Sequence, residues 1–314
     1  MADKIATRES YGNALAELGE KYDFVVLDAD LAAATKTGIF KKKYPERFFD
    51  CGIAEGNMMS VAAGLAAAGK TVFASSFAMF AAGRAFEQVR NSICYPHLNV
   101  KIGATHAGIT VGEDGATHQC IEDFALMRSI PGMTVINPAD DVEARAAVEA
   151  AINFQGPVYM RFGRFAVPVL NDKASYKFEI GKGICMKDGT DLTIVATGMM
   201  VSMALDAAKV LEEKGISTRV INIHTIKPID RDILVKAAAE TGAIVTAEEH
   251  TVIGGLGSAV AEVVAEECPV PVVRLGVEDQ FGHSGKVPPL LEMYGLTVAN
   301  LVAKAEAAYA KKQK

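Results

Sequence analysis

Short apolar runs alternate with longer helical patterns along most of the chain, and this alternation limits the fold more than any other feature of the sequence. A strand that is apolar at every position is buried on both faces, which is typical of a parallel sheet covered by helices. The sequence therefore predicts an α/β fold in which each domain is a mostly parallel sheet sandwiched between helices.

The alternation stops between about residues 166 and 189, where Pro168, turn-forming polar residues and several glycines replace it. Such a stretch predicts a connection with one hairpin. The 314 residues are enough for a buried core on each side of it. We therefore expect a first domain over residues 1–165, a linker over 166–189 and a second domain over 190–314.

The apolar runs also place the individual elements. In the first domain we expect strands at 23–30, 48–51, 71–74, 100–105, 134–137 and 158–162, and helices over 7–19, 57–68, 78–92, 121–128 and 140–154. In the second domain we expect strands at 192–196, 218–222, 244–247 and 272–275, and helices over 202–214, 230–241, 257–267 and 297–310.

The composition argues against several classes of protein. A net charge of −6 and the lack of a long basic cluster argue against a nucleic-acid partner. The opening residues lack the apolar core of a signal peptide, and no run approaches the ~20 apolar residues of a membrane span, so we expect a cytoplasmic protein with no membrane partner. The five cysteines lie singly, which indicates reduced thiols and no metal site on this chain.

The segment Val111–Asp123, VGEDGATHQCIED, holds the densest group of chemically active residues. Its glycines disfavour a regular helix or strand, and it follows a predicted strand. Because loops at strand ends carry the chemistry of open α/β sheets, His106 could converge there with Asp114 and His118. A solvated turn with an incidental histidine is the alternative interpretation.

Other candidates lie at strand ends and helix starts. Asp30 ends a predicted strand, and Glu55 lies at a strand-to-helix junction, where an acid commonly favours the positive end of the helix dipole. Phe77 and Phe80 are three residues apart, so their rings share one face, and core packing is the usual role of such a pair.

Arginines complete the set of candidate residues. Imidazoles with a pKa near neutrality exchange protons with sugar hydroxyls, and the guanidinium groups of Arg8, Arg161 and Arg164 suit phosphate. The composition of the whole set is typical of a site for phosphorylated sugars. The glycine run Gly254–Gly257 lacks the third glycine of the dinucleotide fingerprint, so we expect no phosphate site there.

Longer runs give the chain a family resemblance. They are KIATRESYGNAL, DCGIAEGNMMSVAAGLAAAGK, SSFAMFAAGRAFEQVR, THAGITVGEDGATHQCIEDFALMRSIPGM and NPADDVEA. These runs strongly resemble the pyrimidine-binding half of transketolases, thiamine-diphosphate enzymes of the pentose phosphate pathway. The resemblance is close from Lys4 to about Arg164 and looser to the C-terminus, which resembles the third domain of transketolases.

The resemblance implies a cofactor site. Glu55 matches the glutamate that donates a hydrogen bond to the pyrimidine ring and thereby activates the cofactor. Phe77 and Phe80 match aromatics that pack on that ring, and Asp30 matches an acid close to the cofactor.

It also implies a substrate site. His118 matches a catalytic residue near the reacting carbonyl, Asp114 one that binds a sugar hydroxyl, and His106 one that acts towards the phosphate end. Arg8 and Arg164 match the arginines that bind the substrate phosphate.

Three departures from the family pattern change these expectations. An aromatic of the pyrimidine pocket is replaced by Gly83, and a phosphate-binding serine by Ala34, next to Thr35. The GDG segment with a downstream Asn, which binds the diphosphate and its metal, is absent from the sequence. The resemblance therefore implies a split transketolase: this chain would be the C-terminal subunit, and an N-terminal subunit with the GDG motif would bind the diphosphate with Mg or Ca, in an assembly with two copies of each chain.

Alternatives remain open. A 1-deoxyxylulose-5-phosphate synthase fragment and the beta subunit of a 2-oxo acid dehydrogenase share this architecture, and the spacing of Arg161 and Arg164 is similar to the synthase. A non-catalytic assembly subunit is the alternative from another class. The preferred sugars and the role of the C-terminal domain are not predicted by the sequence.

Overall fold

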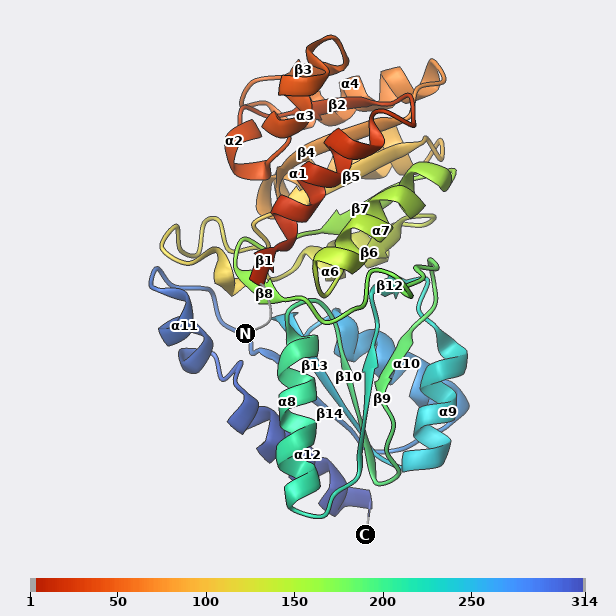
Figure 1. Cartoon of the computed structure of the whole chain (residues 1–314), viewed down its shortest axis with the longest axis vertical. Coiled ribbons are helices and arrows are strands. Elements are labelled where there is room, and N and C mark those ends of the chain that lie inside the picture. Colours follow the sequence, from red (N-terminus) through yellow and green to blue (C-terminus); the bar gives the residue numbers. More distant parts are fainter. Residues whose placement is uncertain (1–3, 313–314) are drawn as a thin grey trace.

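The computed structural model describes residues 4–312, so residues 1–3 and 313–314, at the outer ends of the two predicted domains, lie outside it. Within that range, a seven-stranded and a five-stranded sheet each have helices packed on both faces. The N-terminal sheet lies above the C-terminal one in Figure 1. The predicted α/β class with mostly parallel, helix-covered sheets is confirmed. The predicted division into 1–165, 166–189 and 190–314 stays a proposal.

The seven-stranded sheet has the order β12-β6-β7-β5-β4-β2-β3, and only β12 runs antiparallel to its neighbour. Alternate residues of β2 are buried on opposite faces: Leu27 packs in a cluster with α4, and Val26 packs with α1 and α7. This two-sided burial explains the continuous apolar run. The strands are β2 (Val25–Asp28), β3 (Phe48–Asp50), β4 (Val72–Phe77), β5 (Val100–Thr105), β6 (Thr134–Ile136), β7 (Val158–Arg161) and β12 (Thr225–Lys227), and the helices are α1 (Thr7–Leu18), α2 (Ala32–Thr35), α3 (Gly38–Lys43), α4 (Glu55–Ala67), α5 (Phe86–Gln88), α6 (Asp123–Ser129) and α7 (Asp141–Asn153).

The five-stranded sheet has the order β14-β13-β10-β11-β9, with β9 antiparallel at its edge. Helices α8 and α12 bury one apolar face against it, and α9 and α10 cover the other. The strands are β9 (Ile184–Lys187), β10 (Leu192–Ala196), β11 (Thr218–Asn222), β13 (Ile244–Thr251) and β14 (Val272–Val277), and the helices are α8 (Met200–Glu213), α9 (Arg231–Thr241), α10 (Leu256–Glu267), α11 (Val287–Met293) and α12 (Val298–Lys312).

Two local predictions were wrong. The expected linker hairpin does not form, because β8 (Ala166–Pro168) pairs with β1 (Lys4–Ala6) and β9 pairs with β11. The expected single helix over 78–92 is instead two π-helical segments, Met79–Arg84 and Val89–Cys94, on either side of α5. Such π-helical turns are frequent at functional sites, and they change which side chains share a face.

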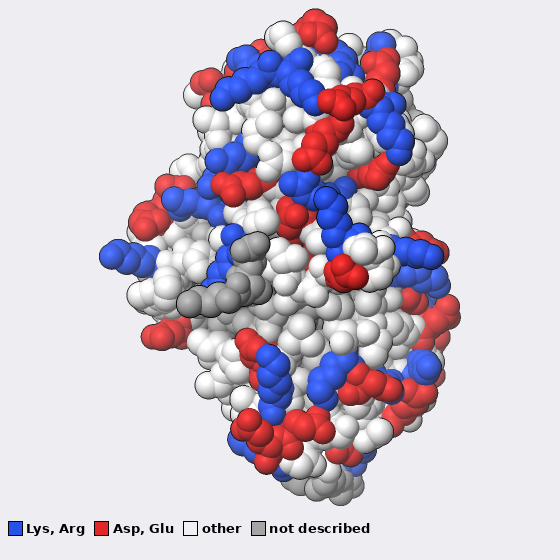
Figure 2. All heavy atoms as spheres, in the orientation of Figure 1, with Lys and Arg blue, Asp and Glu red and all other residues white. Residues whose placement is uncertain are grey.

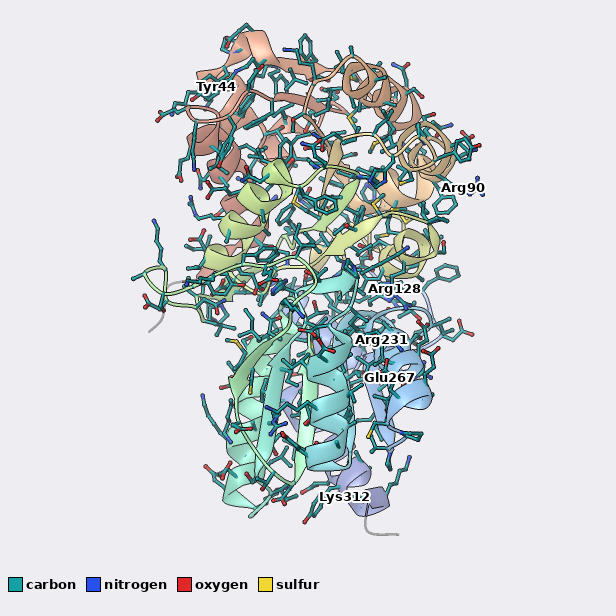
Figure 3. The ribbon with its side chains drawn as sticks, turned by 90° about the vertical axis from the view of Figure 1, so that its right-hand side faces the viewer. Tyr44, Arg90, Arg128, Arg231, Glu267 and Lys312 are labelled. Carbon is teal, nitrogen blue, oxygen red and sulfur yellow. The ribbon has the colours of Figure 1, made fainter. Side chains whose placement is uncertain are left out.

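The two halves are joined by strand pairing and by buried polar contacts. The edge strand β12 comes from the C-terminal half of the sequence and pairs with β6 of the first sheet. Its Lys227 donates to the carbonyls of Arg128 and Ile130 at the end of α6. The Arg128 side chain, at the junction of the two halves in Figure 3, donates to the Gly254 carbonyl at 2.8 Å. The halves are therefore held in a fixed relation by several independent contacts.

The surface charge and the helices can be compared with the two classes that the composition argues against, nucleic-acid-binding and membrane proteins. Basic and acidic side chains are interspersed over the face in Figure 2, without a broad area of one sign. Among residues 4–312, no helix combines the length and apolar character needed to cross a bilayer.

Candidate active site

The predicted site residues gather around the carboxyl ends of the central strands. Phe77 is the last residue of β4, His106 follows the last residue of β5, and Glu55 begins α4. This edge of a parallel sheet is where open α/β proteins bind ligands. The π-helical segment after β4 and the loop after β5 then bring Phe80 and His118 to the same place.

His106 lies at the centre of the group. Its backbone has φ 55°, an uncommon left-handed conformation, and its ring stacks on Phe77 with centroids 3.8 Å apart. Arg8 donates to its Nε2 at 2.9 Å, and the Thr105 hydroxyl bonds Nδ1 at 2.9 Å. Burial, followed by the charges of Arg8 and Arg164, lowers the pKa of His106 to about 3. His106 is therefore a neutral imidazole at physiological pH.

Phe77, Phe80 and His118 form an aromatic cluster. The two phenyl rings lie 6.0 Å apart and nearly parallel, and the His118 ring meets both of them edge-on, at 6.2 and 5.3 Å. The Thr117 hydroxyl bonds Nδ1 of His118 at 2.8 Å and restrains the ring. His106 and His118, which the sequence analysis expected to converge, both lie against the Phe77 ring.

Glu55 has a partner that the sequence analysis did not anticipate. Its carboxylate is almost completely buried, and Arg84 donates to its Oε2 at 2.9 Å while lying 4.4 Å from the centre of the Phe80 ring. Arg84 follows Phe80 by four residues, and this spacing could have indicated that the two side chains meet. The acid predicted to bind the cofactor is thus paired with a cation in this structure.

Arg8 and Arg164 supply positive charge beside His106. Arg8 donates to the Ala34 carbonyl at 3.0 Å, and each arginine acts on the pKa of His106, as does Lys36. Arg164 donates to the Val111 carbonyl and lies 3.4 Å from Glu113. The Nε of Arg8 is buried and lacks a hydrogen-bond partner among residues 4–312. An anionic group at this position would satisfy it.

Two predicted residues lie at the margin. Asp30 is exposed, with φ 61°, and its backbone N–H donates to Asp50 at 3.1 Å. Asp114 is exposed on the loop that also carries His118. Their assigned roles stay predictions.

The two departures near the pocket have structural outcomes. Gly83 lacks a side chain, and the Met79 methyl lies 2.4 Å from the position that a Cβ of residue 83 would occupy. The Met79 thioether therefore fills part of the space of the missing aromatic. Beside Ala34, the Thr35 hydroxyl turns inward and donates to buried Asp28 at 2.8 Å. Thr35 therefore does not replace the missing phosphate-binding serine.

A cavity of about 800 Å³ adjoins the site, between the aromatic cluster and the C-terminal half. Phe80, Arg84 and Thr117 line it on one side, and Ile253 and Phe281 on the other. The last two are large apolar side chains that are 57% and 83% exposed. An apolar, partly open cavity of this kind is typical of a ligand site or of a surface that another chain covers.

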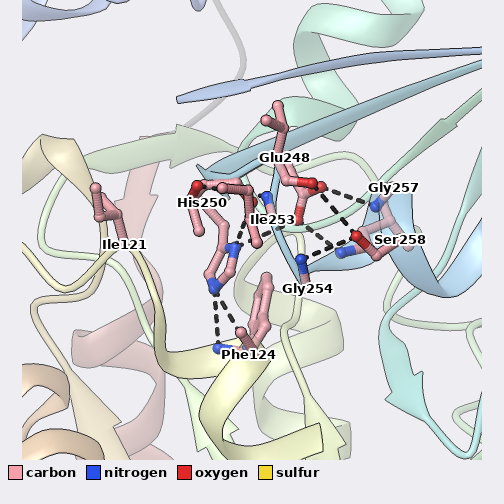
Figure 4. A network of polar contacts seen from close by, with 12 residues as sticks. Ile121, Phe124, Glu248, His250, Ile253, Gly254, Gly257 and Ser258 are labelled. Carbon is pink, nitrogen blue, oxygen red and sulfur yellow. Dashed lines mark hydrogen bonds and ion pairs between the residues drawn. The ribbon is translucent and has the colours of Figure 1, made fainter. Parts of the chain in front are cut away.

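The backbone N–H groups of the glycine run before α10 already bind a side-chain carboxyl group of the same chain. The backbone N–H groups of Leu256 and Gly257 donate to the carboxylate of Glu248, at 2.6 and 2.8 Å (Figure 4). This explains the glycines, because a Cβ at Gly255 would lie 2.0 Å from the Glu248 oxygen. In residues 4–312 no group of three or more His, Cys, Asp or Glu is arranged to hold a metal ion.

Comparison with known proteins identifies the family. The family model for the transketolase pyrimidine-binding domain matches residues 3–169, and that for the transketolase C-terminal domain matches residues 181–301. A Methanocaldococcus jannaschii protein named for the C-terminal section of transketolase is 52% identical and matches 92% of each chain. A subunit of a 6-deoxy-6-sulfo-D-fructose transketolase from Clostridium sp. is 46% identical, over 95% of this chain and 92% of that one.

A solved structure shows the same fold over nearly the whole chain. It is described as a split-gene transketolase, an inactive beta4 tetramer, and it matches with a TM-score of 0.92 and 57% identity over 98% of this chain and 99% of the other. The resemblance noted in the sequence is thereby confirmed: the chain belongs to the transketolase family, among the split chains that carry its pyrimidine-binding and C-terminal domains.

Proposed function

We propose that this chain is the C-terminal subunit of a two-chain transketolase that transfers a two-carbon ketol unit between sugar phosphates. The observation that carries the proposal is the grouping of three kinds of chemistry at one sheet edge. Buried Glu55 is paired with Arg84, which covers the Phe80 ring, two imidazoles contact Phe77, and Arg8, whose buried Nε has no partner among residues 4–312, donates to one of these imidazoles. A ring cofactor, a sugar and an anion need these three groups.

The residues present fit the pyrimidine ring of thiamine diphosphate, on which transketolases depend. The Glu55 carboxylate can hydrogen-bond to a planar heteroaromatic ring, and the Phe80 ring, which lines the cavity, can stack against it. Bound there, thiamine diphosphate would supply the nucleophilic carbon that accepts the ketol unit. Glu55 would hold a proton at the ring nitrogen, and His118 would exchange protons with the hydroxyl of the sugar.

The neutral state of His106 suits a residue that contacts uncharged hydroxyls. With Nε2 accepting from Arg8, its ring is oriented by a cation that also faces the anionic end of a substrate. Arg8 and Arg164 would bind a phosphate there through charge-assisted hydrogen bonds. The sulfosugar relative suggests a second candidate substrate, because a sulfonate is an oxyanion that the same two guanidinium groups could bind.

The diphosphate and its metal would be bound by an N-terminal partner chain, in an assembly with two copies of each subunit. Support comes from the relatives, one of which is named for a C-terminal section and one for a subunit. The exposed apolar residues Ile253 and Phe281, which line the cavity together with Arg84, are suited to contact with such a partner.

Reconstitution tests the proposal. The purified chain alone should show neither ketol transfer nor tight thiamine diphosphate binding by calorimetry with magnesium, whereas addition of an N-terminal subunit should restore both. Binding at about micromolar affinity or tighter by the chain alone, or turnover without a partner, would contradict the split-subunit function.

A further inference from the structure

The loop that carries Asp114 and His118 is attached to the C-terminal domain at both of its ends. The two ends of the loop meet each other, since the Gly108 N–H donates to the Cys120 carbonyl at 2.8 Å. The contacts that hold each end come from one strand, β13, whose residues Glu249, His250 and Thr251 are consecutive. Successive side chains of a strand point in opposite directions, so neighbouring residues can reach different parts of a loop.

Glu249 holds the beginning of the loop. Its Oε1 accepts from the backbone N–H of Thr110 at 2.7 Å, and the carboxylate is buried. Gly108 lies against the same carboxylate: a Cβ there would be 2.3 Å from Oε1, and its φ of 81° also favours glycine. The backbone is therefore shaped to receive this one side chain.

His250 holds the end of the loop (Figure 4). Helix α6 begins at Asp123 without a side-chain cap from its own N-cap residue, and the Nε2 of His250 accepts from Phe124 N–H at 3.1 Å and Ala125 N–H at 3.4 Å instead. Because Nε2 accepts, the proton is on Nδ1, which donates to the Thr251 carbonyl at 2.7 Å. The imidazole thus replaces the missing cap from another domain.

Further contacts fix the strand and the loop relative to each other. Thr251 N–H donates to the Ile121 carbonyl at 2.7 Å. Arg161, fully buried, donates to the Glu249 carbonyl at 2.8 Å and to Asp123 at 2.9 Å. Arg161 therefore lies between the domains and away from the predicted phosphate site.

We propose that Glu249 and His250 are positioning residues that hold the loop from Gly108 to Phe124 in the geometry that turnover requires. This inference rests on the proposed function, because it takes His118 to act in catalysis. It gives the C-terminal domain a task within the reaction. Loss of either acceptor would release one end of the loop, and a displacement of catalytic groups by about 1 Å can cost on the order of 100-fold in rate.

Amide hydrogen exchange of the full-length chain tests the attachment without any turnover. In the wild type, Thr110 and Phe124 should exchange slowly, in contrast to the exposed loop residues Glu113 and Asp114. Glu249→Met should speed exchange at Thr110, and His250→Leu at Phe124, by about tenfold or more. Glu249→Gln and His250→Gln keep an acceptor oxygen and should restore slow exchange.

Glu143→Met is the matched control. Glu143 is also a buried carboxylate that accepts a backbone N–H, from Ala139, and it bonds Asn222 across the domain junction. Its loss should lower the melting temperature without changing exchange in the loop. Fast exchange of Thr110 and Phe124 in the wild type would overturn the proposal even if no variant folds.

Kinetics in the reconstituted complex complete the test. The Met and Leu variants should lower kcat about 10- to 100-fold, with cofactor affinity unchanged, and the Gln variants should recover most of it. Unchanged kcat in variants whose loop exchanges faster would overturn the positioning role. A wild-type complex without ketol transfer would instead overturn the proposed function, and the exchange results would still decide whether the loop is held.

Discussion

Arg84 lies on the carboxylate of Glu55, with Nη1 2.9 Å from Oε2, while its guanidinium covers the Phe80 ring at 4.4 Å. It thus occupies both the acid and the aromatic face that we assign to the cofactor ring. This arrangement compensates a buried charge that would otherwise be costly. Arg84 would therefore compete with a cofactor ring that binds at Glu55 and Phe80.

Replacing Arg84 by Met should therefore tighten thiamine diphosphate binding in the reconstituted complex. Arg84 is half exposed, so solvent screening limits the contact to about 1 kcal/mol, or about fivefold in affinity. Calorimetric titration measures it, with Arg90→Met, an exposed arginine nearby in the sequence, as the control. Unchanged or weaker binding would show that Arg84 does not compete with the cofactor.

Glu55→Ala should fold and assemble but lose cofactor activation, because the proton donor to the ring is gone. We expect a loss of about 100-fold or more in rate. NMR of proton exchange at the reactive carbon of the cofactor, in the reconstituted complex, measures activation directly. Glu87→Ala, which removes an exposed acid in α5, should leave the exchange rate unchanged. Normal exchange in the Glu55 variant would reduce this residue to a helix-start acid.

Arg8→Ala and Arg164→Ala separate phosphorylated from unphosphorylated donors. Each change removes a charge-assisted contact of roughly 1.5–3 kcal/mol, which is about a 10- to 150-fold loss, mainly in KM. Hydroxypyruvate, which has no phosphate, should be much less affected than a phosphorylated ketose. Equal losses on both donors would mean that these arginines serve the fold or the cofactor.

The neutral state of His106 can be observed in the isolated chain. Its pKa is lowered to about 3, first by burial and then by Arg8, so its ring signals should not titrate between pH 5 and 8 in NMR spectra. Arg8→Met removes the second cause and should raise the pKa, while burial keeps it below the ordinary value of 6.5. A wild-type midpoint near 6.5 would contradict the enclosed position of this ring.

Glu143 should make stability depend on pH. Burial raises its pKa from 4.5 to about 7, so the folded state binds a proton that the unfolded state has released. Its contribution to stability is therefore complete below pH 4.5 and is lost as the pH rises through 7. Glu143→Gln should remove that component of the decline. Melting temperatures of both proteins between pH 5 and 8 test this, and parallel pH profiles would refute it.

The local sequence pattern was sufficient to predict most of the fold. It failed to predict strand pairings between segments that are far apart in the sequence. The two-sided burial of β2 is visible in its continuous apolar run, and so the sheet class could be predicted. The pairing of β8 with β1, or of β12 with β6, joins residues far apart in sequence, and no local signal specifies such a partner.

The candidate site shows the same division. His106 could be selected because it directly follows a predicted strand, and Phe77 because the resemblance matched it to an aromatic of the cofactor pocket. The pairing of β4 with β5 brings the two together. The pairing of Arg84 with Glu55, and of Glu249 with the backbone of Thr110, depends on side-chain directions set by a π-helical turn and by the packing of two domains. Neither leaves a periodic pattern in the sequence.

The position of β12 has a consequence for synthesis. Proteins fold as they emerge from the ribosome, with N-terminal domains first, yet the first sheet of this chain has its edge strand at Thr225–Lys227. Until that segment has been made, β6 presents an unpaired edge, which is prone to pair with other nascent chains. The N-terminal half thus needs sequence as far as Lys227, beyond the linker, before its own sheet is closed, and a fragment ending in the linker would carry an unpaired strand edge.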